Sequence, residues 1–462
     1  MDKRFPLEDQ IEMLGSMIRG RVVAPHHVDF DAMRLVAVAQ FDHLRPAAIV
    51  RVASPSDVAT VLNFAQATDL PVAVRAGGHS TGGHGVADGA LVIDLRDLKG
   101  IEIDAEARTV WAGAGCTAGE VTTTVEKHGL IVGFGDSGSV GIAGLTLGGG
   151  IGYLVRKHGL TIDSLLAVEI VTAAGDILVA NETNHADLFW AVRGGGGNFG
   201  VITRFKYRLH PLPAFTGGPL VYPPVPEIIA GFAALAEQAP EELSTIAMIM
   251  PLPPAPFVPA EFHGKPAFVA MMAYAGDDEA AQRALAPFRA LATPVADLVA
   301  PGPFSSLYMM DPPPEARAMV SVRSRFSNRF GIEEARALVA AAASSTAPMS
   351  AAQIRVLGGA HARVAADGTA FAHRDSRFMI SFLAMYGGGP DVITEQERWA
   401  TDSVTAVAPA SSGAYVNFLG HAEGDVGFAA AYPAATLSRL RRVKRQYDPE
   451  NLFRLNTNVT PA

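Results

Sequence analysis

Glycine clusters are the residues of this sequence whose spacing most directly suggests chemistry. Four lie within residues 75–200: RAGGHSTGGHG (75–85), GAG (113–115), GFGDSGSVGIAGLTLGGGIG (133–152) and GGGGNFG (194–200). Glycine lets a ligand approach the backbone, and consecutive amides in such loops form nests that bind anions. One cluster alone is typical of a tight turn. All four in one stretch favour a site for a large ligand with a diphosphate.

The last cluster also matches the dinucleotide fingerprint G-x-G-x-x-G through Gly195, Gly197 and Gly200. That fingerprint binds a diphosphate where it follows a strand and opens a helix. Here the order is reversed, because the helical segment DLFWAVRG precedes the glycines and the strand-like segment VITRFKYRL follows them. We therefore reject a nicotinamide-binding fold of the Rossmann type.

The composition excludes several classes of protein. The chain has 462 residues, with 37 Lys and Arg against 46 Asp and Glu, and its net charge of −9 argues against general nucleic-acid or anionic-membrane binding. Cys116 is the one cysteine, which excludes an internal disulfide and cysteine-rich zinc or iron–sulfur sites. The charged N-terminal segment does not resemble a secretory signal, and no apolar run is long enough to span a bilayer. We expect a cytoplasmic protein of two or three domains without a metal site.

Short strands and helices must position the glycine clusters. Ser54, Pro55 and Asp57 predict the start of a helix. A Pro/Gly-rich connector at 211–226 then introduces a region of Ala-rich helices and strands, such as AFVAMMAY and RFMISFLAMY, without clustered glycines. Near the C-terminus, a predicted helix carries a basic run that we interpret as a solvated face: Arg439, Arg441, Arg442, Lys444 and Arg445. The β-branched runs that predict strands are 71–75, 90–95, 101–105, 109–113, 201–210 and the two arms of a hairpin at 165–180.

Six segments together resemble the berberine bridge enzyme-like flavoprotein oxidases of the vanillyl-alcohol oxidase superfamily, whose FAD fold is named after p-cresol methylhydroxylase. The resemblance implies an α+β fold of two domains. Residues 1–212 and 413–462 would form a discontinuous FAD-binding domain, and residues 213–412 a substrate-binding domain of antiparallel sheet covered by helices. The segments, in the family's order, are VRAGGHSTGGHG, GSVGIAGLTLGGGIGYLVRKHGLTIDSLLAVEIVTAAGDIL, DLFWAVRGGGGNFGVITRFKYRLHPL, AFAHR, AYVNF and YDPENLFRLNTNV.

The resemblance assigns a covalent flavin to His79. In the family, the first glycine loop holds the FAD pyrophosphate, and the histidine of its GGH motif is bonded to the flavin 8α-methyl carbon. His79 stands at that position, whereas we interpret His84 as a loop residue. The other positions that the resemblance places at FAD are Arg75, Ala76, Gly77, Gly78, Ser80, Ser137, Ser139, Gly144, Gly148, Gly149, Val201, Tyr415 and Asn417.

Many family members add a second covalent link through a cysteine, and Ser137 stands where that cysteine would be. Serine forms no thioether, and Cys116 lies elsewhere, so we predict a single histidyl link and a buried Cys116. Val140 matches the family position that gates oxygen. A small β-branched residue there resembles the oxidases, which favours O₂ as the electron acceptor.

Catalytic candidates follow from the last segments. Strand alternation places Met379 and Ser381 on one face, where relatives often carry Lys with Gln or Glu. Neither residue is a carboxylate base. Tyr415 and Asn417 of AYVNF lie at the flavin ring in the family, and a tyrosine with a lowered pKa could act as base. Two further candidates are Tyr153 and His421. The apolar positions that suit either an aromatic ligand or, equally, core packing are Met379, Phe382, Met385, Met309 and Met310.

We therefore predict an FAD-dependent oxidase. It would take a hydride from a C–H beside an amine or hydroxyl of a small aromatic or heterocyclic metabolite and reduce O₂ to H₂O₂. The singly linked flavin resembles bacterial enzymes acting on such compounds more than the carbohydrate oxidases. The alternatives are a flavin oxygenase of natural-product tailoring, a carbohydrate oxidase, a dehydrogenase with another acceptor, and a flavin-binding protein without turnover. The sequence indicates no oligomeric state.

Overall fold

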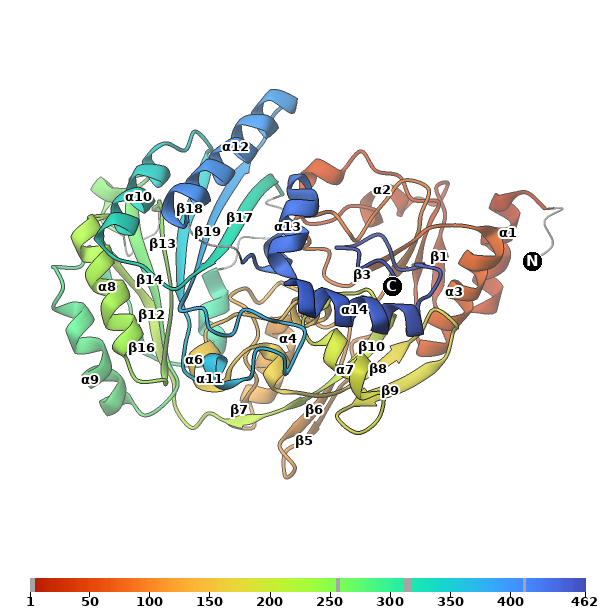
Figure 1. The fold of residues 1–462 in the computed structure, drawn as a ribbon, viewed down its shortest axis with the longest axis horizontal. Helices are drawn as coiled ribbons and strands as arrows, with labels where there is room; N and C mark the ends of the chain where they lie inside the picture. Colours follow the sequence, from red (N-terminus) through yellow and green to blue (C-terminus); the bar gives the residue numbers. More distant parts are fainter. Residues whose placement is uncertain (1–4, 255–257, 311–316, 410–412) are drawn as a thin grey trace.

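A computed structural model describes residues 5–254, 258–310, 317–409 and 413–462. Its sheets fall into two groups (Figure 1). The smaller sheets lie within residues 21–211, and one large sheet spans residues 216–386. After residue 413 the chain packs again on the first group, where the Asn198 amide donates to the Thr457 carbonyl. The expected boundary at residues 412 and 413 falls beside residues 410–412, which lie outside the described residues.

The first sheet has the order β1-β2-β4-β3, with β2, β4 and β3 parallel and β1 antiparallel. Helix α3 (Pro55–Thr68) connects β2 to β3 and begins as predicted, because the Asp57 backbone N–H donates to Ser54 Oγ. Helix α1 (Leu7–Met17) packs on α3. The strands are β1 (Arg21–Val23), β2 (Ala48–Arg51), β3 (Val72–Arg75) and β4 (Leu91–Asp94).

The second sheet is antiparallel, in the order β5-β6-β10-β8-β9, and the predicted hairpin at 165–180 is confirmed as β8 and β9. The glycine cluster at 75–85 follows β3 of the first sheet, whereas the clusters at 133–152 and 194–200 precede strands of this second sheet. The strands are β5 (Ile101–Asp104), β6 (Thr109–Gly113), β8 (Leu165–Val171), β9 (Ile177–Asn181) and β10 (Val201–Arg208), with β7 (Leu130–Ile131) and β11 (His210–Pro211) paired separately. The helices are α2 (Phe30–Met33), α4 (Ala118–Glu126), α5 (Ile142–Leu147), α6 (Val155–His158) and α7 (Ala186–Val192).

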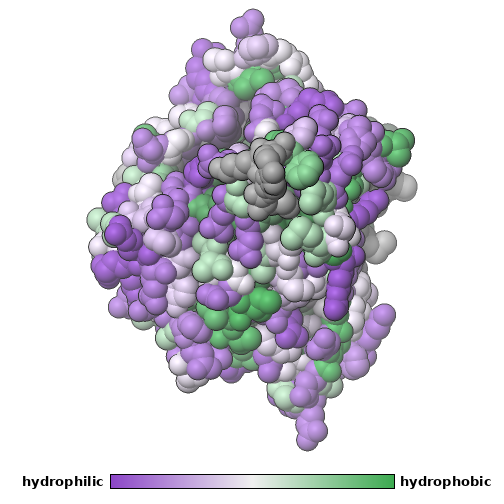
Figure 2. All heavy atoms as spheres, turned by 90° about the vertical axis from the view of Figure 1, so that its right-hand side faces the viewer, coloured by the Kyte–Doolittle hydropathy of each residue, from purple (hydrophilic) through white to green (hydrophobic). Residues whose placement is uncertain are grey.

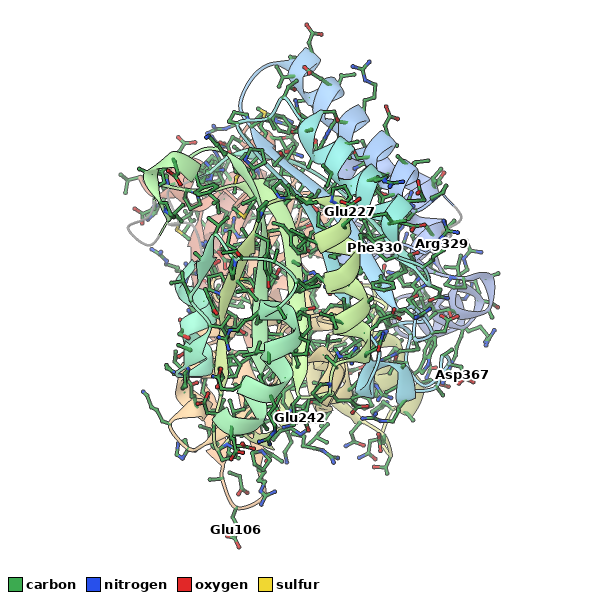
Figure 3. The ribbon with its side chains drawn as sticks, turned by 90° about the vertical axis from the view of Figure 1, so that its left-hand side faces the viewer. Glu106, Glu227, Glu242, Arg329, Phe330 and Asp367 are labelled. Carbon is green, nitrogen blue, oxygen red and sulfur yellow. The ribbon has the colours of Figure 1, made fainter. Side chains whose placement is uncertain are left out.

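The third sheet has eight antiparallel strands, and helices cover one of its faces (Figures 1 and 3). Phe330, labelled in Figure 3, packs in the apolar core between sheet and helices, 5.7 Å from the Phe378 ring. The expected substrate-domain fold, an antiparallel sheet covered by helices, is therefore confirmed. The strands are β12 (Thr216–Tyr222), β13 (Leu243–Pro251), β14 (Pro266–Tyr274), β15 (Ala296–Asp297), β16 (Ala300–Pro301), β17 (Met319–Ser327), β18 (Met349–Val356) and β19 (Phe378–Tyr386). The helices are α8 (Pro226–Gln238), α9 (Asp278–Arg289), α10 (Ile332–Ala343), α11 (Ala360–Arg363) and α12 (Pro390–Val407).

The opposite face of this sheet, which we call the inner face, is set by the strand register. Ser381 pairs with Gln353 on one side and Ser324 on the other, and Met379 pairs with Arg355. Side chains at paired antiparallel positions share a face. The inner face therefore includes Met248, Met349, Gln353, Arg355, Met379, Ser381, Leu383 and Met385.

The C-terminal segment contains α13 (Gly424–Ala431) and α14 (Ala434–Tyr447). The solvated face predicted for α14 is wrong at Lys444. Its ammonium is fully buried and donates to Asp448 Oδ2 at 2.6 Å and to the Asn198 and Phe453 carbonyls. Lys444 thus ties the C-terminal helix to the glycine run at 194–200.

Hydrophilic side chains are spread over the end of the molecule that carries α1 and β9, with hydrophobic ones scattered between them (Figure 2). Among the described residues, no helix is long and apolar enough to cross a membrane.

Candidate active site

The first glycine loop touches the second glycine segment backbone to backbone. It leaves β3 at Arg75, and a Cβ on Gly77 would stand only 2.5 Å from the backbone nitrogen of Gly141. The reverse substitution at Gly141 meets Gly77 at the same distance. Gly78 has φ +73°, a conformation that favours glycine. These glycines are therefore required for the two loops to meet.

His79 follows this contact, and its side chain is exposed beside the otherwise half-buried loop. Ser80 Oγ lies 3.2 Å from His84 Nδ1 and also accepts the Gly82 backbone N–H, so His84 and Ser80 hold the loop in shape. Burial lowers the pKa of His84 to about 4, so its imidazole is neutral at physiological pH.

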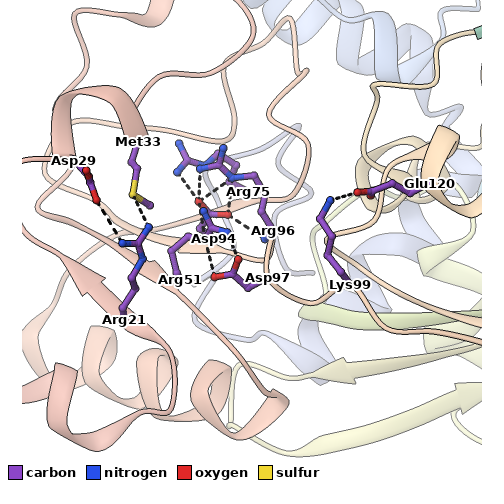
Figure 4. Close-up of polar contacts among 10 residues, drawn as sticks. All are labelled: Arg21, Asp29, Met33, Arg51, Arg75, Asp94, Arg96, Asp97, Lys99 and Glu120. Atoms are coloured by element: carbon purple, nitrogen blue, oxygen red, sulfur yellow. Dashed lines mark hydrogen bonds and ion pairs between the residues drawn. The ribbon is translucent and has the colours of Figure 1, made fainter. Parts of the chain in front are cut away.

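The Arg75 side chain is used within the protein. Its guanidinium is buried and donates to Asp94 Oδ2 at 2.7 Å (Figure 4). It also donates to the Arg34 carbonyl. Asp94 also accepts from Arg96. The guanidinium of Arg75 is thus used to fix the start of the loop, which leaves its backbone for the expected cofactor contact.

The segment at 136–142 is held in place by backbone bonds to the neighbouring segment that contains Cys116. Ala118 N–H donates to the Val140 carbonyl, and Ile142 N–H donates to the Cys116 carbonyl. Ser139 is exposed and Val140 is half-buried, whereas Cys116 is fully buried. The predicted burial of Cys116 is therefore confirmed, and this burial raises the pKa of its thiol to about 11. Ser137 Oγ lies 2.9 Å from Ser139 Oγ.

The third glycine run packs on the end of α5. The backbone N–H groups of Gly194 and Gly196 both donate to the Leu147 carbonyl at 3.0 Å. A Cβ built on Gly144 or Gly197 meets no described atom within 4 Å, so both Cα atoms border open space. The Val201 side chain is buried in the core at the start of β10, which leaves its backbone for any cofactor contact.

Tyr415 and Asn417 contact the second glycine segment. A Cβ on Gly148 would stand 2.0 Å from Asn417 Oδ1, and the Asn417 amide donates to the Leu145 carbonyl and to Tyr415 Oη. Gly150 N–H also donates to Tyr415 Oη at 3.0 Å. Burial nevertheless raises the pKa of Tyr415, so the expected tyrosine with a lowered pKa is wrong for this structure.

On the inner face, the two strand candidates have different surroundings. Met379 is fully buried in an apolar cluster with Phe326, Phe371 and Tyr415. Ser381 Oγ donates to Gln353 Oε1 at 3.2 Å. Met379 therefore supports Tyr415 by packing, and Ser381 is the polar position of the pair.

The remaining sequence candidates are dispersed. Phe382 lies on the helix-covered face, 5.8 Å from the Trp399 ring, so its expected ligand contact is wrong. Tyr153 is buried in the apolar cluster under the inner face, and His421 is exposed against Phe41. Met385 is half-buried on the inner face. The side chains of Met309 and Met310 lie outside the described residues.

Sequence reasoning missed a polar group that joins the inner face to the second glycine segment. Arg355 Nε donates to Gln353 Oε1 at 2.8 Å, and Nη2 donates to Asp136 Oδ2 at 2.6 Å. The alternation AAQIRV, with polar residues two apart in an apolar strand, was the available signal.

Comparisons with known proteins agree on one family. Residues 46–181 match a model described as FAD binding domain, and residues 414–460 match one described as berberine and berberine like. (R)-6-hydroxynicotine oxidase of Paenarthrobacter nicotinovorans is 29% identical, over 96% of this chain and 97% of its own. An FAD-dependent monooxygenase of Fusarium proliferatum is 38% identical, over 43% of this chain and 40% of its own. The crystal structure of 6-hydroxy-D-nicotine oxidase from Arthrobacter nicotinovorans superposes with a TM-score of 0.86 at 26% identity, covering 96% of this chain and 98% of that chain.

Proposed function

Because the chain belongs to the berberine bridge enzyme-like FAD-linked oxidoreductases, we propose that it is an oxidase of small aromatic or heterocyclic amines or alcohols. The substrate C–H beside the nitrogen or oxygen loses a hydride, and its two electrons pass on to O₂, which becomes H₂O₂. The proposal divides the chain into an FAD-binding part, residues 1–212 and 413–462, and a substrate-binding part, residues 213–412.

The described residues fit FAD. Gly144 and Gly197 each border space that a side chain would fill, and Gly77 and Gly141 bring two loops into backbone contact. Backbone amides in such loops suit a diphosphate. FAD supplies the acceptor for the two electrons of the oxidation when it is bound. Candidate holders are Arg75 and Val201 through their backbones, Ala76, Gly77, Gly78, Ser80, Ser137, Ser139, Gly144, Gly148, Gly149, Tyr415 and Asn417.

His79 is proposed as the single covalent attachment point. Its ring is exposed at the rim of the loop, and Ser137 offers no thiol for a second link. Wild-type protein that is acid-precipitated and washed should retain yellow flavin, and His79→Ala should release it. A colourless wild-type precipitate would contradict the covalent link.

The side chains of the inner face support an aromatic substrate. The described strand positions of this face hold no carboxylate, and its half-buried side chains are mostly apolar, including Met248, Leu383 and Met385. Such a face suits an aromatic body. A neutral amine releases a hydride without a strong base, so an amine fits a site where Tyr415 keeps its proton.

A substrate panel tests this function. Aromatic and heterocyclic amines, alcohols and sugars are added anaerobically to the flavin-loaded protein, and flavin bleaching is followed before air is admitted and peroxide is measured. We expect bleaching and stoichiometric peroxide with an aromatic or heterocyclic member. Turnover of oligosaccharides alone, or reduction of dyes without peroxide, would contradict the proposal. Val140→Leu should slow reoxidation by O₂ if Val140 gates oxygen.

A second candidate is a flavin oxygenase, favoured by the similarity of the glycine-rich part to the Fusarium monooxygenase. Turnover under ¹⁸O₂ separates the two functions. Label in the organic product supports the oxygenase, and label in peroxide alone supports the oxidase.

A further inference from the structure

Arg355 joins the inner face to three segments of the flavin-side region. Its side chain is 3% exposed and lies on β18. Nη2 donates to Asp136 Oδ2, Nη1 donates to the Ile151 carbonyl at 2.9 Å, and the guanidinium lies 5.2 Å from the Phe418 ring centroid. A planar guanidinium holds several acceptors in fixed directions, which a lysine ammonium does not.

The same side chain orients Gln353. Arg355 Nε can only donate, so the Gln353 amide must turn its oxygen toward Arg355, where that oxygen also accepts from Ser381 Oγ. Gln353 is 9% exposed, and within the described residues its amide nitrogen has no hydrogen-bond partner. The NH₂ group is therefore left as a donor on the inner face.

We propose that Arg355 is a positioning residue that presents the Gln353 NH₂ as a hydrogen-bond donor to the substrate, which selects compounds bearing a neutral or anionic acceptor. The proposal rests on the proposed function, because it concerns the substrate side of the same site. Substrate amines would bind as the neutral base, whose lone pair accepts a hydrogen bond, and carbonyl or phenolate oxygens would bind in the same way.

The charges around Arg355 agree with this selection. Asp136 is the carboxylate that balances Arg355, and it is engaged in that pair. Since the described strand positions of the inner face hold no carboxylate, a substrate ammonium would find no counter-charge on them. The Arg355 charge also counteracts part of the burial effect on the pKa of Tyr415, which places a positive potential at this junction.

Ligand binding without turnover provides the test. Two probes are titrated into the resting flavin-loaded protein and followed by the flavin absorbance: benzamide, with a carbonyl acceptor, and benzyltrimethylammonium, with a cation and no acceptor. Wild type should bind benzamide more tightly. Arg355→Lys keeps the positive charge but loses the planar guanidinium that orients Gln353. Benzamide binding should weaken about tenfold, as expected for the loss of one hydrogen bond to an oriented donor.

Arg156→Lys is the matched control. Arg156 is also buried and joins the same two regions, because it donates to the Leu357, Glu237 and Ala239 carbonyls. Among the described residues it makes no hydrogen bond to Gln353. If Arg156→Lys binds benzamide with unchanged affinity, the weaker binding of Arg355→Lys results from the lost orientation of Gln353. Equal loss in both variants, or no loss in Arg355→Lys, would overturn the proposal, as would a wild type that does not bind benzamide.

Gln353→Glu gives a second test if Arg355→Lys folds poorly. The carboxylate keeps the Arg355 contact but replaces the donor by an acceptor, so the preference should reverse toward benzyltrimethylammonium. A preserved benzamide preference would overturn the proposal. The proposed oxidase activity fails separately, through an absence of flavin bleaching by the substrate panel, and that result leaves these binding constants interpretable.

Discussion

The glycine-rich half of the molecule forms its candidate site from backbone, whereas the eight-stranded half forms its site from side chains. In the glycine-rich half, backbone meets backbone, as at Gly77 and Gly141, and side chains such as Arg75 and Lys444 serve to hold those loops. In the eight-stranded half, the sheet is continuous and the inner face is made by alternating side chains, with Gln353 and Ser381 among methionines. We therefore expect substitutions at the backbone contacts of the glycine-rich half to disrupt its fold. Substitutions on the inner face of the sheet should alter ligand binding and leave the fold intact.

The largest effect is expected at Gly77, where the glycine-rich half depends on contact between two backbones. Gly77→Ala places a methyl group 2.5 Å from the Gly141 nitrogen, and because the obstacle is backbone, the loops must separate. We expect loss of bound FAD and of most soluble folded protein, a destabilisation above about 3 kcal/mol. Gly100→Ala is the control, since its Cβ meets no described atom within 4 Å. Normal flavin content in Gly77→Ala would show that backbone contact is not essential.

Lys444→Met tests the side-chain supports of the glycine-rich half. The change leaves the buried Asp448 carboxylate without its cation, although the Leu452 and Phe453 N–H groups still donate to it. The loss of one partner of a buried pair costs about 3–5 kcal/mol. Chemical denaturation measures it, and Arg442→Met, on the exposed side of the same helix, should change stability by less than about 0.5 kcal/mol.

Acid should destabilise the glycine-rich half at the contact between His158 and His210. His158, at the end of α6, stacks on His210 at 3.9 Å, and burial lowers their pKa values to about 3 and about 4. Above pH 6.5 both are neutral folded and unfolded, so neither affects the pH dependence. Below pH 6.5 both imidazoles become protonated in the unfolded chain but stay neutral in the folded chain. The free energy of unfolding therefore falls as the pH falls toward 4.

His158→Phe keeps a ring in the stack and removes one titrating group. The loss of unfolding free energy between pH 6.5 and 4.5 should become shallower, and stability at pH 8 should change little. His26→Phe, at an exposed histidine, is the control. An unchanged slope in His158→Phe would assign the acid sensitivity to other groups.

Met385→Ala tests the eight-stranded half and has the smallest expected effect on the fold. Met385 is half-buried on the inner face, so its truncation should lower stability by less than about 1.5 kcal/mol. The KM for an aromatic substrate should rise several-fold while flavin content stays normal. A loss of flavin instead would mean that the inner face also supports the cofactor.

Much of the glycine-rich half could be predicted because its motifs describe backbone geometry. The Ser54 cap, the hairpin at 165–180 and the buried Cys116 follow from local rules and are confirmed. The burial of Lys444 was not predicted, because its partner Asp448 is brought to it by tertiary packing, as Asp94 is to Arg75. Side chains contributed by neighbouring strands were hardest to foresee. Gln353 joins Ser381 only through a strand register that no single segment encodes.

The buried Cys116 has a practical consequence. The chain holds one thiol, fully enclosed and with its pKa raised to about 11, so peroxide and alkylating reagents in neutral solution meet no thiolate on the surface. Any cysteine introduced at an exposed position would be the sole reactive thiol of the folded protein. A fluorophore or an electrode surface can therefore be attached at a chosen point without first removing native cysteines.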